Sequence, residues 1–213
     1  PFRVLKNAID SQQFIANENT RREVRQELGL ENKFVVGHVG RLHPQKNHDF
    51  LIDVFAEIKK KQPDAELILV GTGPLEEKVR SKVADKGLTE SVQFLGNRKD
   101  MNRIYQAMDI FVFPSLFEGL GIVAIEAQAA GVPIVCSEGL PPETDITPIY
   151  RKLMLSDGAE KWAEAAIEMA QSSKAHTNMQ KYIIDAGFDM NATAKNMEEY
   201  YLEKEAQIRE KNK

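Results

Sequence analysis

Residues 109–136 read DIFVFPSLFEGLGIVAIEAQAAGVPIVC, and this stretch decides the fold class. It opens with an apolar run that closes at Pro114, continues into a nearly all-apolar helical segment from Gly121 to Ala130, and ends in a second apolar run at 133–136. Strands that are apolar along their whole length are typical of parallel sheets covered on both faces. The stretch therefore predicts a strand–helix–strand unit whose helix is also buried.

The same alternation of short apolar strands and helices extends outward on both sides of this unit. The expected strands lie at 34–40, 66–71, 92–96 and 151–155, and the expected helices at 47–60, 75–86, 104–108, 159–171, 177–186 and 191–209. Asn47 is expected to cap the helix that follows it. The alternation predicts an α/β fold, a Rossmann-like doubly wound parallel sheet with trailing C-terminal helices.

Length and composition exclude several other classes of protein. The 213 residues suffice for one large domain or two small ones, and the single cysteine, Cys136, excludes a disulfide framework or a multi-thiolate zinc site. A formal net charge of -4 argues against nucleic-acid binding, and no apolar run approaches the roughly 20 residues of a membrane span. Residues 1–5 resemble an extended strand without an initiator methionine, which suggests a piece of a longer chain.

Two cations follow the first expected strand. Gly40 and Arg41 end that strand, and Lys46 lies five residues beyond the arginine, across a turn. Ligands of open α/β sheets bind outside the carboxyl ends of the strands, and arginine and lysine are suited to phosphate oxygens. The segment is equally compatible with a solvated loop that carries two ordinary surface cations.

Glycine-rich and basic turns follow the second and third strands. Residues 71–74 (GTGP) permit a tight turn into a helix, with Gly73 at its centre, and Arg98 lies in a locally basic turn at 96–100. Taken alone, 71–74 is better explained as an ordinary strand-to-helix turn, and a solvated turn explains 96–100 at least as well as a nucleotide pocket does. The third glycine of the dinucleotide fingerprint and its acidic ribose partner are missing, which disfavours a Rossmann oxidoreductase.

Two carboxylates and a glycine-rich helix start follow the fourth strand. Glu118 precedes Gly119, and Glu126 lies eight residues later inside the apolar helix. A buried carboxylate requires a hydrogen-bonding partner, and sugar or ribose hydroxyls are suitable donors. The amides of 119–123 at the helix amino terminus could hold a diphosphate. The alternative is that Glu126 pairs with a buried arginine of the fold.

Several other side chains are interpreted as structural. His38 alternates within a strand and is expected to be packed, whereas His43 and His48 are expected to be solvated loop residues beside Lys46. Cys136 is expected to be a buried thiol and Trp162 a core residue.

Taken together, the chain resembles the carboxyl-terminal, nucleotide-sugar-binding domain of the group 1 (family 4) retaining glycosyltransferases of GT-B fold, in the bacterial exopolysaccharide-synthesis branch. The resemblance covers essentially the whole chain. Its matching segments are 7–14 (NAIDSQQF), 40–46 (GRLHPQK), 71–74 (GTGP), 92–96 (VQFLG), 114–126 (PSLFEGLGIVAIE) and 127–135 (AQAAGVPIV). Departures from the family pattern are Leu120, where phenylalanine is commoner, and the segment 137–143 (SEGLPPE), where the family commonly has two glycines and a glutamate.

The resemblance implies a role for each matching residue. The implied catalytic residues are Arg41 and Lys46, which neutralise the leaving diphosphate, and Glu118, which contacts the transferred sugar. The implied donor-binding residues are Gly40, Gly73, Arg98, Gly119, Leu120, Gly121, Ile122, Val123 and Glu126, the last of these holding the ribose hydroxyls. The implied substrate is a nucleotide diphosphate sugar, with a UDP-sugar favoured. No cofactor or metal is implied, and the chain contains no Asp-x-Asp.

The resemblance also implies a domain organisation. Residues 1–213 would form a single donor-binding domain with a trailing amphipathic helix at 189–213, and the N-terminal acceptor-binding domain would be absent, leaving the isolated fragment inactive. The acceptor would be a saccharide or a lipid-linked molecule. The location would be cytoplasmic, with peripheral association at the inner membrane face as a further expectation. The alternative is a non-catalytic module that binds nucleotide diphosphates.

Overall fold

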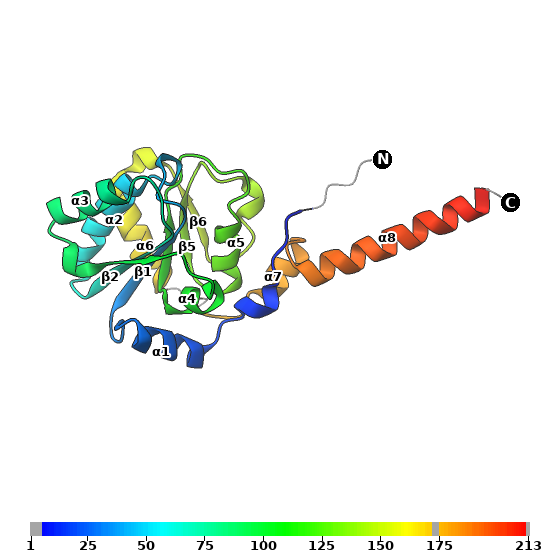
Figure 1. Cartoon of the computed structure of the whole chain (residues 1–213), viewed down its shortest axis with the longest axis horizontal. Coiled ribbons are helices and arrows are strands. Elements are labelled where there is room, and N and C mark those ends of the chain that lie inside the picture. The colour runs from blue at the N-terminus through cyan, green and yellow to red at the C-terminus, as the bar shows by residue number, and fades with distance from the viewer. Residues whose placement is uncertain (1–5, 172–174, 212–213) are drawn as a thin grey trace.

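Six parallel strands form the centre of the fold, in the order β3-β2-β1-β4-β5-β6. The structure is a computed structural model and describes residues 6–171 and 175–211 (Figure 1). The strands are β1 (Phe34–Val39), β2 (Ala65–Val70), β3 (Val92–Gly96), β4 (Ile110–Phe113), β5 (Ile134–Ser137) and β6 (Tyr150–Leu153). Each lies within two residues of its expected position, so the predicted doubly wound parallel sheet is confirmed.

Helices cover both faces of this sheet. The helices on the two faces are α1 (Glu18–Glu27), α2 (His48–Lys61), α3 (Glu76–Asp85), α4 (Met101–Ala107), α5 (Ile122–Ala129) and α6 (Gly158–Ala170), and α7 (Gln180–Asp185) and α8 (Met190–Lys211) follow them in the chain. One apolar cluster joins α2, α3 and α6 to one face, and a second joins α1, α4 and α5 to the other. Successive strand residues point to opposite faces, which is why β1, β2, β4 and β5 are largely apolar along their length. Trp162 is fully buried in the first cluster, as expected.

The strand order changes direction between β1 and β4. From β1 the chain adds β2 and β3 on one side, and it then returns to place β4, β5 and β6 on the other. In open α/β sheets the ligand-binding crevice lies at this point, outside the carboxyl ends of the strands. Arg41 and Lys46 follow β1, and Glu118 follows β4. These candidate residues therefore lie at the switch point.

The loops after β1 and β2 pack backbone against backbone. The Leu42 amide donates to the Thr72 carbonyl over 3.0 Å, and a Cβ atom on Gly73 would lie 2.5 Å from the Leu42 carbonyl oxygen. Gly71 has φ +124°, and a Cβ there would lie 2.2 Å from the Gly40 oxygen. Both glycines of the GTGP turn are thus required by this close approach alone.

Helix α1 has no counterpart among the expected elements. Val24 is its only buried residue, so these ten residues lack the stripe of apolar side chains by which the other helices were expected. Arginines hold the helix instead: Arg21 and Arg25 both pair with Asp109, whose carboxylate also accepts from the Val35 amide over 2.7 Å. This clamp lies at the amino edge of the sheet, away from the candidate site.

Helix α2 starts differently from the expectation. Asn47 adopts a left-handed conformation (φ 53°, ψ 47°), its side chain makes no capping hydrogen bond, and the helix begins at His48. The expected asparagine cap is therefore wrong. Asn47 instead makes the turn from the 3₁₀ helix at Pro44–Lys46 into α2, a conformation that asparagine tolerates better than most residues.

Helix α8 leaves the body of the molecule soon after it begins (Figure 1). Its first amide, on Met190, donates to the Ile9 carbonyl over 2.8 Å, while Tyr201 and Leu202 are exposed further along. This element is the expected trailing helix, whose last two residues lie outside the described part, as does the strand expected at 1–5. Among the described residues, no helix combines the length and the apolar character needed to span a bilayer.

Candidate functional site

A largely buried ion pair lies at the switch point. The Lys46 ammonium is 2.6 Å from Glu118 Oε1, and the two side chains are only 15% and 7% exposed. The same ammonium lies 4.7 Å from the centre of the Phe113 ring, within the range of a cation–π interaction. A lysine from the loop after β1 and a glutamate from the loop after β4 thus meet across the crevice.

Neighbouring residues fix the position of this pair. A Cβ on Gly40 would lie 3.0 Å from Lys46 Cε, so the glycine leaves room for the lysine stem. Gln45 joins the two loops, because its carbonyl accepts from the Leu116 amide and its side-chain amide donates to the Phe117 carbonyl, each over 2.8 Å. These bonds tie the β1 loop to the segment that carries the glutamate.

The amino terminus of α5 lies beside this ion pair, since Glu118 Cγ is 3.6 Å from the place of a Cβ on Gly121. Gly121 precedes the helix in a left-handed conformation (φ 71°, ψ 51°) and supplies no side-chain cap. Within the described part of the chain, the amides of 119–123 donate to no protein acceptor, and the first helical bond runs from the Ala124 amide to the Gly121 carbonyl. Free amides and the helix dipole make this terminus suitable for an anion.

Glu126 lies half-buried one turn further along α5. Its Oε2 accepts a hydrogen bond from the Tyr105 hydroxyl over 2.9 Å, and burial raises the pKa of the carboxyl although that bond opposes the rise. In the described residues Glu126 has no arginine partner, so the alternative of a buried Glu–Arg pair is wrong.

The other two predicted cations differ in their surroundings. Arg41 is exposed, and its guanidinium has no hydrogen-bond or ion-pair partner in the part of the chain that the structure describes. Arg98 forms a bidentate pair with Asp100, at 2.8 and 2.7 Å, and this pairing raises the pKa of the guanidinium. Arg41 is therefore free to meet an anion, whereas Arg98 would have to share or exchange its carboxylate.

The predicted site residues form two groups with direct contacts. The first group is the Lys46–Glu118 ion pair with a glycine beside each partner. Gly40 lies beside the lysine stem, and Glu118 Cγ lies 3.6 Å from the place of a Cβ on Gly121. Val123 and Glu126 share the Tyr105 hydroxyl. Arg41, Gly73 and Arg98 follow β1, β2 and β3 at the same edge, without a hydrogen bond or ion pair to either group among the described residues.

Two buried histidines lie beneath Lys46. His38 is packed as expected, and its Nδ1 lies 2.9 Å from the Val112 carbonyl. His48 is only 2% exposed and lies edge to face against His38, with ring centres 4.7 Å apart, so its expected place in a solvated loop is wrong. The first turn of α2 packs onto β1 and buries the ring. Burial, with the Lys46 charge, lowers the pKa of His48 to about 4.

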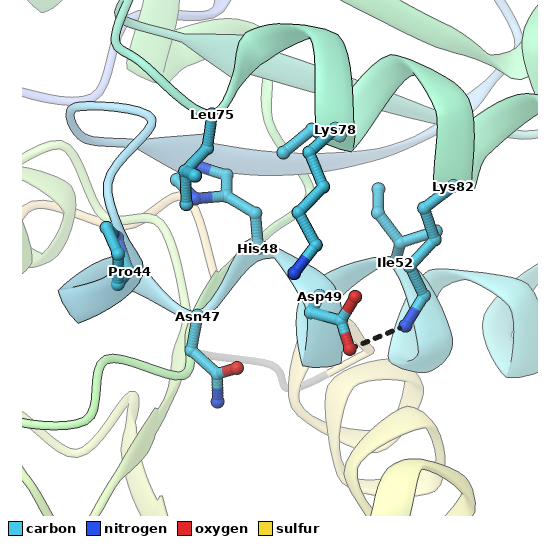
Figure 2. A pocket seen from close by; sticks show the side chains of 9 residues that line it. Pro44, Asn47, His48, Asp49, Ile52, Leu75, Lys78 and Lys82 are labelled. Carbon is cyan, nitrogen blue, oxygen red and sulfur yellow. Dashed lines mark ion pairs between the residues drawn. The ribbon is translucent and has the colours of Figure 1, made fainter.

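A cavity of about 260 Å³ lies elsewhere, between α2 and α3 (Figure 2). Its lining residues are Pro44, Asn47, His48, Asp49, Ile52, Leu75, Lys78, Val79 and Lys82. None of the predicted site residues is among them. Two of the charged side chains in its lining, Lys82 and Asp49, already form an ion pair with each other at 3.0 Å. Among the described residues no cluster of three or more His, Cys, Asp or Glu side chains is placed to hold a metal ion.

Sequence patterns missed three residues of the site. Gln45 lies between the two predicted cations in the sequence, and this position could have marked it as a residue of the site. Phe113 and Tyr105 are apolar-face residues of β4 and α4, and no pattern distinguishes them from ordinary core. Only the tertiary structure brings them to Lys46 and Glu126.

Cations, a carboxylate and a free helix terminus at the switch point of this sheet define a Rossmann-like domain of the GT-B type. The chain belongs to the glycosyl transferases group 1, since the model of that family matches residues 20–186. The family resemblance read from the sequence is therefore confirmed.

Named relatives agree with this assignment. A putative glycosyltransferase, EpsF, from Bacillus subtilis is 32% identical over 173 residues, which are 80% of this chain and 45% of EpsF. A GDP-mannose-dependent phosphatidylinositol monomannoside mannosyltransferase from Corynebacterium glutamicum is 33% identical over 79% of this chain and 46% of its own length. The crystal structure of HepE from Anabaena, in complex with UDP and glucose, superposes with a TM-score of 0.78 at 25% identity, over 93% of this chain and 56% of HepE. The chain spans about half the length of these relatives.

Proposed function

We propose that this chain is the donor-binding half of a retaining glycosyltransferase that moves a sugar from a nucleotide diphosphate sugar to a polysaccharide or lipid-linked acceptor. One observation carries the proposal: the Lys46–Glu118 pair, 2.6 Å apart, lies beside the uncapped amino terminus of α5. Family membership and the presence of UDP in the complex of the similar HepE support it.

The proposed chemistry follows from charge development. When the glycosidic bond to the diphosphate breaks, negative charge grows on the diphosphate while the sugar carbon becomes cationic. Lys46, the free Arg41 and the amides of 119–123 would stabilise that negative charge without reorganising, which is the largest contribution that a preformed site makes. Glu118 would accept hydrogen bonds from sugar hydroxyls, and Glu126 from the ribose.

The lysine and the glutamate need not separate for this to occur. An ammonium carries three donors, of which Glu118 uses one, and a second can reach a phosphate oxygen. Glu118 Oε2 has only a long contact, 3.4 Å, to the Gln45 amide, so it retains capacity for a sugar hydroxyl. The pair would thus hold both parts of the donor at once.

We favour a UDP-sugar as donor. The similar HepE was crystallised with UDP and glucose, whereas the name of the Corynebacterium relative specifies GDP-mannose. The turn at 96–100, with Gly73 across from it, is the proposed edge of the base pocket, and release of Arg98 from Asp100 would allow that arginine to approach a base or phosphate.

The acceptor half is proposed to lie outside these residues. The relatives are about twice as long as this chain, and a donor domain alone supplies one wall of a two-domain cleft. We therefore propose residues 1–213 as a single donor domain that is inactive in transfer by itself and that works with an acceptor-binding domain, metal-independently and, in the whole protein, peripherally at the cytoplasmic membrane face.

Calorimetric titration of the chain with UDP, GDP and NAD tests this proposal. We expect UDP to bind, GDP to bind less tightly and NAD not to bind. A folded chain that binds neither UDP nor GDP would contradict a donor domain. UDP binding without sugar transfer, once the chain is joined to an acceptor half from a relative, would instead favour the alternative of a non-catalytic module.

A further inference from the structure

Tyr105 lies in the core next to the proposed ribose-binding carboxylate. It belongs to α4, is fully buried, and its hydroxyl lies 2.9 Å from Glu126 Oε2 and 3.2 Å from the Val123 carbonyl. Its ring packs against Phe111 and Phe14, with ring centres 6.0 Å apart in each case. The hydroxyl is therefore fixed by its surroundings rather than by the carboxylate itself.

We propose that Tyr105 is the positioning residue that orients Glu126 toward the ribose hydroxyls of the donor. The proposal rests on the donor-binding function above. A glutamate side chain on a helix has several rotamers, and a hydrogen bond from a fixed hydroxyl to Oε2 selects among them. Among the described residues Glu126 Oε1 has no hydrogen-bond partner, so this oxygen is left to accept from the ligand.

The same hydroxyl connects two parts of the site. Val123 belongs to the first turn of α5, whose amides are proposed to meet the diphosphate, and Glu126 lies on the next turn. Because Tyr105 reaches both the Val123 carbonyl and the carboxylate, it fixes the helix start relative to the ribose acceptor. Positioning before binding reduces the ordering that the ligand must impose, and it therefore raises affinity.

The pH dependence of UDP binding reports on the Glu126 carboxyl, and a purely structural role of Tyr105 would not change it. Burial raises the pKa of Glu126, and the hydrogen bond from Tyr105 works against that rise. Loss of the hydroxyl should therefore raise the pKa further, so that Glu126 stays protonated to higher pH. If the ionised carboxylate accepts the ribose hydroxyl, the acid limb of UDP binding must move to higher pH with it.

The test compares wild type with Tyr105→Phe, which keeps the ring and removes only the hydroxyl. Calorimetry with UDP and with 2′-deoxy-UDP across pH is the measurement, and Glu126→Gln completes the cycle. Tyr105→Phe should weaken UDP binding roughly three- to tenfold, weaken the deoxy analogue less, and shift the acid limb upward. In a Glu126→Gln background, the Tyr105→Phe change should have no further effect on the ratio of UDP affinity to 2′-deoxy-UDP affinity, here called the UDP preference.

Tyr150→Phe is the matched control. It removes another partly buried hydroxyl contact, 2.9 Å from the Thr144 hydroxyl, at β6. It should leave both the UDP preference and the acid limb unchanged. Should Tyr105→Phe not fold, difluorotyrosine at position 105 serves instead: its more acidic hydroxyl donates more strongly and should shift the acid limb downward.

Two outcomes would contradict different claims. A wild type that binds UDP and discriminates against the deoxy analogue, with Tyr105→Phe showing the same ratio and the same pH profile, overturns the positioning role alone. A wild type that binds no UDP overturns the donor function on which the role depends.

Discussion

Lys46 and Glu118 illustrate how a single contact organises the site. Each charge is largely removed from water, and each is tolerated because the other lies 2.6 Å away and Phe113 faces the ammonium. Removal of one partner of such a pair leaves the other uncompensated, which is far more costly than losing an exposed pair. The residues that would act on the donor are therefore also residues on which the local fold depends.

Lys46→Ala should impair both properties. We expect UDP affinity to fall roughly 10- to 100-fold, because a charge-assisted hydrogen bond to the diphosphate is lost. We also expect the free energy of unfolding to fall by about 3 kcal/mol, because Glu118 is left unpaired. Calorimetry and urea denaturation measure the two effects. Lys60→Ala, which removes an exposed lysine of α2 that pairs with Glu57, should change neither. Wild-type UDP affinity in Lys46→Ala would remove this lysine from the site.

At the scale of loops and helices, the glycines separate into two kinds. Gly73 is required by the protein itself, because a Cβ there would meet the Leu42 carbonyl at 2.5 Å. Gly119 has no positive φ, and a Cβ there would meet nothing within 4 Å. If glycine is needed at 119, the need comes from a ligand that approaches the backbone.

Two alanine substitutions test this difference. Gly73→Ala should lower the free energy of unfolding by about 1–3 kcal/mol through overpacking of the β1 and β2 loops. Gly119→Ala should leave the melting temperature unchanged and weaken binding of UDP-glucose. The melting temperature and calorimetry together distinguish them. Unaltered UDP-glucose binding in Gly119→Ala would contradict the proposed place of the sugar and diphosphate.

The elements also show which parts of the fold the sequence specifies. The strands β1, β2, β4 and β5 were predictable because they are largely apolar runs closed by glycine, proline or a polar turn, whereas β6 (YRKL) carries two cations and is a weaker pattern. Helix α1 was not predictable, since arginine contacts with Asp109, rather than an apolar stripe, hold it in place. Long-range ion pairs of this kind leave no periodic signal.

The site was predictable in the same uneven way. Spacing alone placed Arg41, Lys46 and Glu118 at strand ends, because a parallel sheet brings all carboxyl ends to one edge. Spacing could not show that Lys46 and Glu118, 72 residues apart, pair directly, or that Arg98 is bound to Asp100. Side-chain pairing depends on tertiary geometry, as does the burial of His48.

At the scale of the whole molecule, charge is unevenly placed. The chain carries a formal net charge of -4, yet Arg41, Lys46 and the α5 terminus are gathered at the carboxyl edge of the sheet. A crevice can focus positive potential in this way and still belong to an acidic protein. Burial lowers the pKa of both buried histidines beneath that edge, and the nearby Lys46 charge lowers it further.

Acid should therefore destabilise the fold through His48. Its pKa is about 4 in the folded chain and near the ordinary 6.5 when unfolded, so the unfolded state binds more protons between these values. The free energy of unfolding should fall as pH drops from 6.5 toward 4, with His48 contributing up to about 3 kcal/mol. His48→Gln should flatten this slope, although His38 and His176 keep part of it.

Urea denaturation at several pH values between 4 and 7 is the measurement. His43→Gln, which replaces an exposed imidazole in the loop before α2, is the control and should keep the wild-type profile. A His48→Gln variant with an unaltered acid slope would show that this ring does not govern acid stability.

The most direct test of the central claim is a crystal structure of this chain with UDP bound. We expect the diphosphate to lie between Arg41, Lys46 and the amides of 119–123, with a ribose hydroxyl on Glu126 Oε1. A diphosphate bound in the cavity between α2 and α3, or at the amino edge of the sheet, with the crevice at the switch point unoccupied, would contradict this expectation.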